Sequence, residues 1–196
     1  MNAQLPDGRL TTPELRRELT LAKERARIIR KVASVAAFNG WVTAVIAALS
    51  VPFAPFSLVG FLITCGLALV AYNEFRGRKR LLAFDPSAAT LLGWNQLGFL
   101  AMISAYCGWM LFTNLNSFSS QLQANPELEE ALGSLSEFEG LYRLVVVGLY
   151  GTVFVLSVIF QGLNAIYYFT RRKYVDAYLQ ETPAYVQEIE RSMSAD

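Results

Sequence analysis

The stretch YNEFRGRKR, residues 72–80, decides how this chain folds. Four positive charges stand there within five residues, at the end of a long segment that carries no charge. Residues 32–73, 86–126 and 144–170 all lack Asp, Glu, Lys and Arg. A membrane-spanning helix needs about 20 predominantly apolar residues. The pattern therefore predicts an all-α protein that crosses a membrane.

Composition supports this class and narrows the function. Of the 196 residues, 54% are hydrophobic and 17% are charged, whereas soluble domains average about 25% charged residues. The net charge of +1 gives no sign of nucleic-acid binding. The chain has no histidine, which excludes His-based acid–base catalysis and His metal ligands. No catalytic or phosphate-binding motif is found, so we expect no enzyme, no cofactor and no metal.

The three charge-free segments predict four spans. The first segment is too long for one helix and is interrupted by Pro52 and Pro55, so it suits two spans joined by a short apolar hairpin. The second segment becomes polar after Phe112. The predicted spans are 32–50, 56–73, 88–112 and 144–169, and together they predict an integral membrane four-helix bundle within 32–173.

The distribution of positive charge predicts the orientation. Lys and Arg concentrate in cytoplasmic loops. With four spans, sixteen of the seventeen Lys and Arg residues fall on one side, and Arg143 is the exception. Five glutamates lie in the opposite loop, 113–142. We therefore expect an acidic outer loop and cytoplasmic N- and C-termini, in the plasma or inner cell membrane.

Both terminal segments read as helices. Thr12-Pro13-Glu14 is typical of a helix start, and nothing interrupts the helix before Pro52. Residues 1–31 therefore form a basic, amphipathic cytoplasmic extension of the first span. Residues 174–196 form a cytoplasmic helical tail that restarts at Thr182-Pro183, and we expect this tail to dock on the N-terminal helix.

Small side chains follow one face of the first long helix at spacings of three and four. This seam suits either packing within the chain or an interface between copies, because small residues let helix backbones approach closely in lipid. Its residues are Leu15, Leu19, Ala22, Ala26, Ile29, Ala33, Ala36, Gly40 and Ala44.

Amide side chains recur at a similar depth in three spans. Such groups usually join helices by hydrogen bonds, and the alternative is a polar lining for water or a small solute. This intramembrane polar layer comprises Asn39, Asn95, Gln96, Gln161, Asn164 and Tyr168.

Basic residues flank the predicted inner membrane surface and should attract anionic lipids. The candidates for this contact are Arg27, Arg30, Lys31, Arg76, Arg78, Lys79, Arg80, Arg171, Arg172 and Lys173.

These features favour a structural or interaction role, either as a homo-oligomeric scaffold or as an accessory subunit of a larger membrane complex. A multi-copy channel or small-solute transporter with an amide-lined path is the second hypothesis. The third is a membrane enzyme with a surface carboxylate, for which Glu74 and Asp85 are the acids beside the inner boundary.

Overall fold

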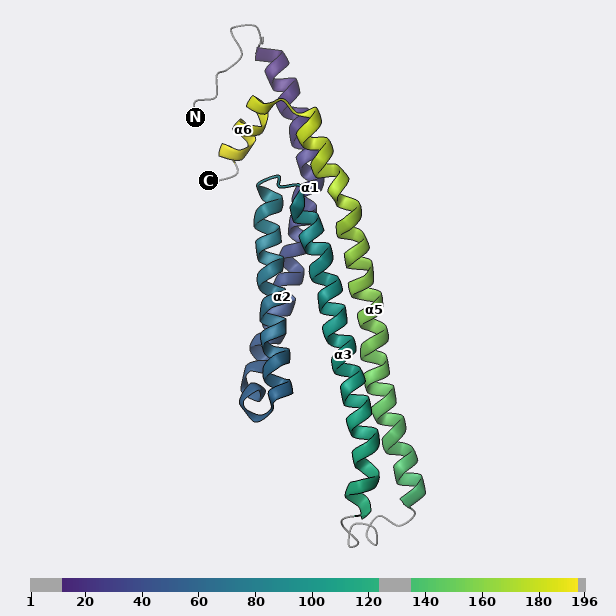
Figure 1. Cartoon of the computed structure of the whole chain (residues 1–196). Helices are drawn as coiled ribbons and strands as arrows, with labels where there is room; N and C mark the ends of the chain where they lie inside the picture. Colours follow the sequence, from purple (N-terminus) through teal and green to yellow (C-terminus); the bar gives the residue numbers. More distant parts are fainter. Residues whose placement is uncertain (1–11, 124–134, 194–196) are drawn as a thin grey trace. The chain divides into compact units, whose positions relative to one another are not determined.

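The computed structural model describes residues 12–123 and 135–193, and all regular structure in these residues is helical (Figure 1). The elements are α1 (Thr12–Ser50), the 3₁₀ helix η1 (Val51–Phe56), α2 (Leu58–Leu82), α3 (Ser87–Gln123), α5 (Leu135–Glu181) and α6 (Ala184–Met193). Four of them, α1, α2, α3 and α5, are long and apolar enough to cross a membrane. The predicted helical class and the four candidate spans are thus confirmed.

The two prolines separate α1 from α2, as predicted. The intervening residues form the 3₁₀ helix η1, with Pro55 inside it. Ser57 then starts α2, because its extended backbone stands outside the helix and its hydroxyl oxygen accepts a 3.2 Å hydrogen bond from the Gly60 N–H.

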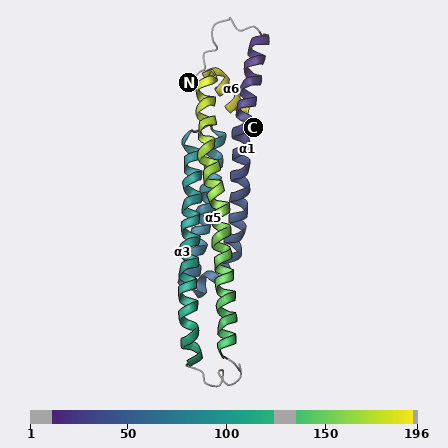
Figure 2. The ribbon, with the colours of Figure 1, turned by 90° about the vertical axis from the view of Figure 1, so that its right-hand side faces the viewer.

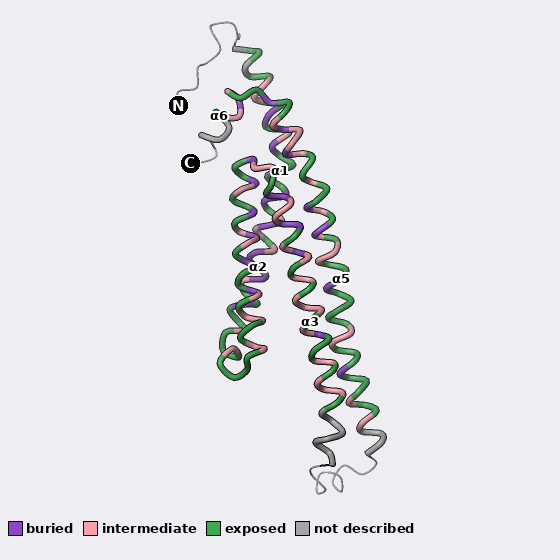
Figure 3. The backbone as a smooth tube through the Cα atoms, viewed as in Figure 1, coloured by how far each residue is buried: buried purple, intermediate pink, exposed green. Residues whose placement is uncertain are grey.

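The chain divides into two compact units. Unit 1 consists of Met1–Gln96 and Asn164–Asp196, and unit 2 consists of Leu97–Leu163. Unit 1 contains parts of all four long helices together with α6, whereas unit 2 contains parts of α3 and α5 only. Most of the buried residues belong to unit 1 (Figure 3).

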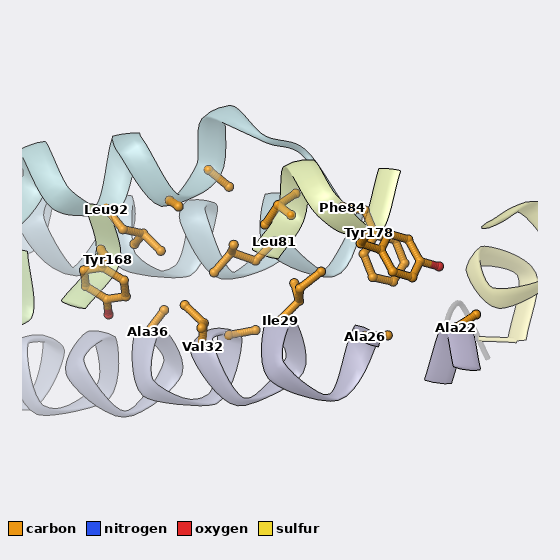
Figure 4. Packing of buried hydrophobic residues seen from close by; sticks show 14 of the residues in the cluster. Ala22, Ala26, Ile29, Val32, Ala36, Leu81, Phe84, Leu92, Tyr168 and Tyr178 are labelled. Atoms are coloured by element: carbon orange, nitrogen blue, oxygen red, sulfur yellow. The ribbon is translucent and has the colours of Figure 1, made fainter. Parts of the chain in front are cut away.

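The core of unit 1 pairs small side chains with large ones. Along α1, Ala26 and Ala36 have no exposed surface, and Ile29 is 1% exposed. They belong to a single hydrophobic cluster with Leu81 of α2 and Leu92 of α3 (Figure 4). Alanine at these positions lets the neighbouring helices approach α1 closely.

A tight turn joins α2 to α3. Phe84 has a positive φ of 58°, a conformation that non-glycine residues rarely adopt. Its ring is 2% exposed and stacks on Tyr178 of α5, with ring centroids 4.2 Å apart. Burial of the ring against Tyr178 offsets the strain of the turn, so this turn also fixes the end of α5.

Asp85 caps α3 within this turn. Its Oδ1 accepts hydrogen bonds from the Ser87 N–H (2.9 Å) and hydroxyl (2.7 Å), and its Oδ2 accepts one from Arg80 Nε (2.7 Å). The Ser87 hydroxyl, followed by the Ser87 N–H and Arg80, holds the pKa of Asp85 below its ordinary value.

This cap predicts a pH dependence of stability. Because the pKa of Asp85 is lower in the folded state, its contribution is present above the ordinary aspartate pKa of about 3.9 and is lost as the pH falls through the folded value. Asp85→Asn should therefore be less stable than the unsubstituted protein at neutral pH, and the difference should shrink on acidification. Unfolding free energies measured at several pH values check this, and a pH-independent difference would contradict it.

The C-terminal tail packs on α1. Arg25 forms a 2.9 Å ion pair with the Glu181 carboxylate and donates a 2.9 Å hydrogen bond to the Glu181 carbonyl oxygen. On α6, Tyr185 donates a hydrogen bond to Glu18, which raises the pKa of the phenol to about 12. Val186 is fully buried. The predicted helix restart and its docking on the N-terminal helix are confirmed.

In unit 2, α3 and α5 run side by side (Figures 1 and 2). The Tyr142 hydroxyl donates a 3.0 Å hydrogen bond to Asn114 Oδ1, which links the two helices. The segment expected as an outer loop, 113–142, is helical at both ends, because residues 113–123 continue α3 and residues 135–142 begin α5. The polar side chain of Asn114 bonds back to the Met110 carbonyl at 2.7 Å, which is compatible with a continuing helix.

Candidate functional site

The side chain of Glu74 has no exposed surface, although it carries an ionisable carboxylate. It occupies the middle of the buried face of α2, where residues recur at spacings of one, three and four. That face consists of Leu67, Val70, Ala71, Glu74, Gly77 and Leu81. A carboxylate therefore stands where a packed helix face would ordinarily carry an apolar residue.

The expectation that Glu74 lies at the surface is wrong. The positive charges that begin at Arg76 suggested that the buried part of the helix ended at residue 73. The helix instead continues to Leu82, and its inward face passes through Glu74 and Gly77. Asp85, the other expected surface carboxylate, is partly exposed and is bonded to Arg80 and Ser87.

Amide groups of α3 hold one carboxylate oxygen. Asn95 Nδ2 and Gln96 Nε2 each donate a 2.8 Å hydrogen bond to Glu74 Oε1. Asn95 Nδ2 also donates to the Val70 carbonyl oxygen at 3.1 Å, and Asn73 Nδ2 donates to Asn95 Oδ1 at 3.2 Å. Since Asn95 accepts one bond and donates two, its amide is fixed in one orientation.

A phenol and a third amide reach the other oxygen. Tyr168 of α5 is fully buried, and its hydroxyl donates a 3.1 Å hydrogen bond to Glu74 Oε2. That hydroxyl in turn accepts a 3.1 Å hydrogen bond from Asn39 Nδ2 of α1. We call Glu74, Asn95, Gln96, Tyr168 and Asn39 the Glu74 site. All four long helices contribute to it within unit 1.

No cation from the described residues neutralises this carboxylate. Among the described residues, no Lys or Arg forms an ion pair with Glu74. The guanidinium of Arg171 lies over the rings of Tyr167 and Tyr174, 4.8 and 5.3 Å from their centroids. An ionised carboxylate without a counter-charge is costly in a desolvated interior, even when it is hydrogen-bonded.

Glycines let the helices close around the site. A Cβ atom on Gly40 would lie 3.1 Å from the Cβ of Glu74, and one on Gly77 would lie 2.4 Å from a methyl carbon of Leu92. A Cβ atom on Gly93 would lie 2.7 Å from the ring of Phe169. These contacts bring α1, α2, α3 and α5 together and exclude solvent from Glu74.

The seam predicted on α1 is used within the chain. Five of its residues are at most 1% exposed and belong to the core of unit 1, namely Ala22, Ala26, Ile29, Ala33 and Ala36. Leu19 packs against that core, and Gly40 lies against α2. Ala44 is half-buried, and the side chain of Leu15 lies outside the described part of the structure.

The predicted polar layer is brought together only in part. Asn39, Asn95, Gln96 and Tyr168 meet at the Glu74 site. Gln161 and Asn164 are half-exposed on α5 and are not bonded to Glu74, and Gln161 belongs to unit 2.

Several of the predicted lipid-contact residues make contacts within the chain. Arg80 binds Asp85 and Ser87, and Arg171 stacks on two tyrosines. Arg172 forms a 3.6 Å ion pair with Asp176, and the Lys173 ammonium lies 5.3 Å from the centroid of the Tyr174 ring. Eight of the ten residues are exposed on unit 1, namely Arg27, Arg30, Lys31, Arg76, Arg78, Lys79, Arg172 and Lys173.

A second feature is an open groove on α5 in unit 2, of about 380 Å³. It is lined by Val147, Gly148, Gly151, Thr152, Val155 and Leu156. A Cβ atom built on Gly148 or Gly151 meets no other part of the described chain within 4 Å, in contrast to the tightly packed Gly77 and Gly93 of unit 1. We call this surface the α5 groove.

Three features were not predicted from the sequence: the burial of Glu74, the hydrogen bond of Asn73 to Asn95, and the α5 groove. A signal for Glu74 was present, because it lies four residues after Val70 and three before Gly77, in step with the apolar face of α2. No match to this chain was found among protein-family models, curated proteins or solved structures.

Proposed function

We propose that this protein is a multi-pass membrane interaction protein that pairs with a second copy of itself through the α5 groove. Its termini are cytoplasmic in this proposal, and the exposed basic residues of unit 1 contact anionic lipid headgroups. The observation that carries the proposal is the α5 groove, where two open glycines lie beside exposed apolar residues on one face of α5.

Glycine lowers the stability of a helix unless close packing at that position compensates for it. Glycine costs roughly 1 kcal/mol relative to alanine in a helix interior. In unit 1 this cost is offset by close helix contacts, such as those at Gly77 and Gly93. Gly148 and Gly151 make no such contact in the described structure. Close approach of another helix supplies the missing compensation, because small residues are what transmembrane helix interfaces use.

The shape of the α5 groove favours a second copy as the occupant. Gly148 and Thr152 form a small-xxx-small pair, and the exposed β-branched residues Val147 and Val155 flank it, 49% and 53% exposed. Two copies inserted in the same direction present the same face to each other across a two-fold axis. The valines of each copy then fill the glycine positions of the other, and residues 144–170 carry no charge that would oppose the pairing.

The amide-lined path has less support. Asn39 bonds to Tyr168, and Asn95 and Gln96 bond to Glu74, so these side chains are directed at one another. The catalytic hypothesis also loses its surface carboxylate at Glu74, which is fully buried.

We expect the double variant Gly148→Leu/Gly151→Leu to be monomeric and the unsubstituted protein to be dimeric. Leucines would fill the α5 groove without displacing a packed helix, because a Cβ atom at either position meets no other described part of the chain within 4 Å. The measurement is the mass of the protein in lipid nanodiscs or mild detergent. Gly108→Leu is the matched control, since it places leucine at another open glycine of unit 2 and should leave the dimer intact.

Two outcomes would overturn this assignment. A monomeric unsubstituted protein would show that the α5 groove does not pair copies. A dimer that persists in the double variant would place the interface elsewhere. A stable complex with a different protein could instead be recovered and be lost in the double variant. The interaction role would then stand, and that protein would replace the second copy as the partner.

A further inference from the structure

Glu74 is surrounded by hydrogen-bonding groups that can satisfy it both with and without a proton. Asn95 and Gln96 donate to Oε1, and an oxygen with two lone pairs accepts both bonds in either form of the group. The two forms therefore differ only at Oε2, which faces the Tyr168 hydroxyl at 3.1 Å.

The hydroxyl of Tyr168 can serve either form. In the ionised form it donates to Glu74 Oε2 and accepts from Asn39 Nδ2. In the protonated form, Glu74 would donate to the phenol oxygen, and the phenol hydrogen would turn to Asn39. Rotation of the Asn39 amide by about 180° presents Oδ1 as the acceptor, and the two ends of a side-chain amide occupy nearly the same space. The three side chains of Glu74, Tyr168 and Asn39 therefore form the same number of hydrogen bonds with one another whether Glu74 is ionised or protonated.

The groups that surround Glu74 in the described structure are uncharged, so no neighbouring charge fixes its protonation state. From α1, Asn39 and Gly40 face it, and residues 32–50 carry no charge. From α3, the uncharged Asn95 and Gln96 face it. From α5, Tyr168 is the titratable group, and on α2 the next polar residue along the same side is the exposed Arg78. Burial penalises the carboxylate, whereas three donated hydrogen bonds stabilise it.

We propose that Glu74 is a proton-binding site, and that uptake or loss of its proton reverses the direction of the hydrogen-bond chain Glu74–Tyr168–Asn39. The proton comes from and returns to water, so the carboxylate becomes a carboxylic acid with no other reactant. Asn39 is half-buried, and the chain therefore runs from the enclosed carboxylate toward the surface of unit 1. This inference is independent of pairing through the α5 groove.

The direct test is infrared spectroscopy of the full chain in nanodiscs, titrated between about pH 4 and pH 9. We expect a carboxylic-acid carbonyl band that appears reversibly on acidification in the unsubstituted protein. The near-isosteric Glu74→Gln should lack this band. If no band is lost in Glu74→Gln, Glu74 does not exchange a proton in this range and the proposal is wrong.

Two variants test the reversal of the chain by the direction of the shift. Tyr168→Phe removes a donor to the carboxylate, so the midpoint of the titration should rise by about one pH unit or more. Asn39→Leu removes one hydrogen bond from each form: the donor to the Tyr168 oxygen when Glu74 is ionised, and the acceptor of the Tyr168 hydroxyl when Glu74 is protonated. A buried donor left without an acceptor costs more than an oxygen that accepts one bond fewer, so the protonated form loses more and the midpoint should fall. Asn164→Leu, a half-exposed amide outside the Glu74 site, is the matched control and should shift nothing. Shifts of the same sign in the first two variants would overturn the reversal.

Discussion

Replacement of Gly77 by leucine should destabilise unit 1 more strongly than a single substitution at an exposed position. Even a Cβ atom at this position would lie 2.4 and 2.5 Å from two side-chain carbons of Leu92. Leu92 is itself fully buried, so it has little room to move. Overpacking of this kind costs about 1–3 kcal/mol for small insertions, and we expect at least about 3 kcal/mol for the whole leucine side chain. The measurement is reversible unfolding in mixed micelles, followed by loss of helical circular dichroism.

Gly98, an open glycine on α3, supplies the control for this substitution. A Cβ atom at Gly98 meets no other part of the described chain within 4 Å. Gly98→Leu should be neutral or stabilising, since leucine exceeds glycine in helix propensity by somewhat less than about 1 kcal/mol. If both substitutions lowered the free energy of unfolding equally, the close approach of α2 and α3 would not explain the requirement for glycine at position 77.

Tyr168→Ala should destabilise unit 1 by a similar amount. The ring of Tyr168 is fully buried in the core of unit 1, and truncation of a buried aromatic residue costs about 3–5 kcal/mol. The variant also removes the hydrogen bond to Glu74 Oε2 and the acceptor used by Asn39. Tyr168→Phe keeps the ring and loses only these bonds, so it should cost about 1–3 kcal/mol.

Tyr167 is the control that separates the effect of losing the hydrogen bonds at Glu74 from the general effect of removing a tyrosine hydroxyl. Tyr167 is half-buried on the same helix and stands outside the Glu74 site. Tyr167→Phe should change stability by less than about 0.5 kcal/mol. If Tyr168→Phe were equally neutral, the hydrogen bonds at Glu74 would contribute nothing to stability.

Much of the fold could be predicted because it depends on local pattern. Pro52 and Pro55 mark the break between α1 and α2 wherever the helices pack. Thr182-Pro183 likewise marks the restart of the tail helix before α6. The sequence also placed Asn39 and Asn95 at a similar depth and Tyr168 on the same face as the amides of the fourth span, and the structure brings these three residues together.

What could not be predicted depends on contacts between helices. The depth of Glu74 was clear, but its direction was not, because the inward face of α2 is set by Gly40 of α1 and Leu92 of α3. The same holds for the α1 seam, whose small residues suit an interface with any helix. Only the folded chain shows that Ala26 and Ala36 are used within unit 1.

The small residues of α1 also limit how far this sequence can diverge without losing its fold. Ala22, Ala26, Ala33 and Ala36 are at most 1% exposed, so only side chains no larger than serine replace them without displacing a neighbouring helix. Phe38 and Trp41, 68% and 65% exposed on the same helix, can exchange with almost any apolar residue. The spacing of the smallest residues is therefore the most constrained feature of this sequence, whereas its exposed large apolar residues tolerate substitution.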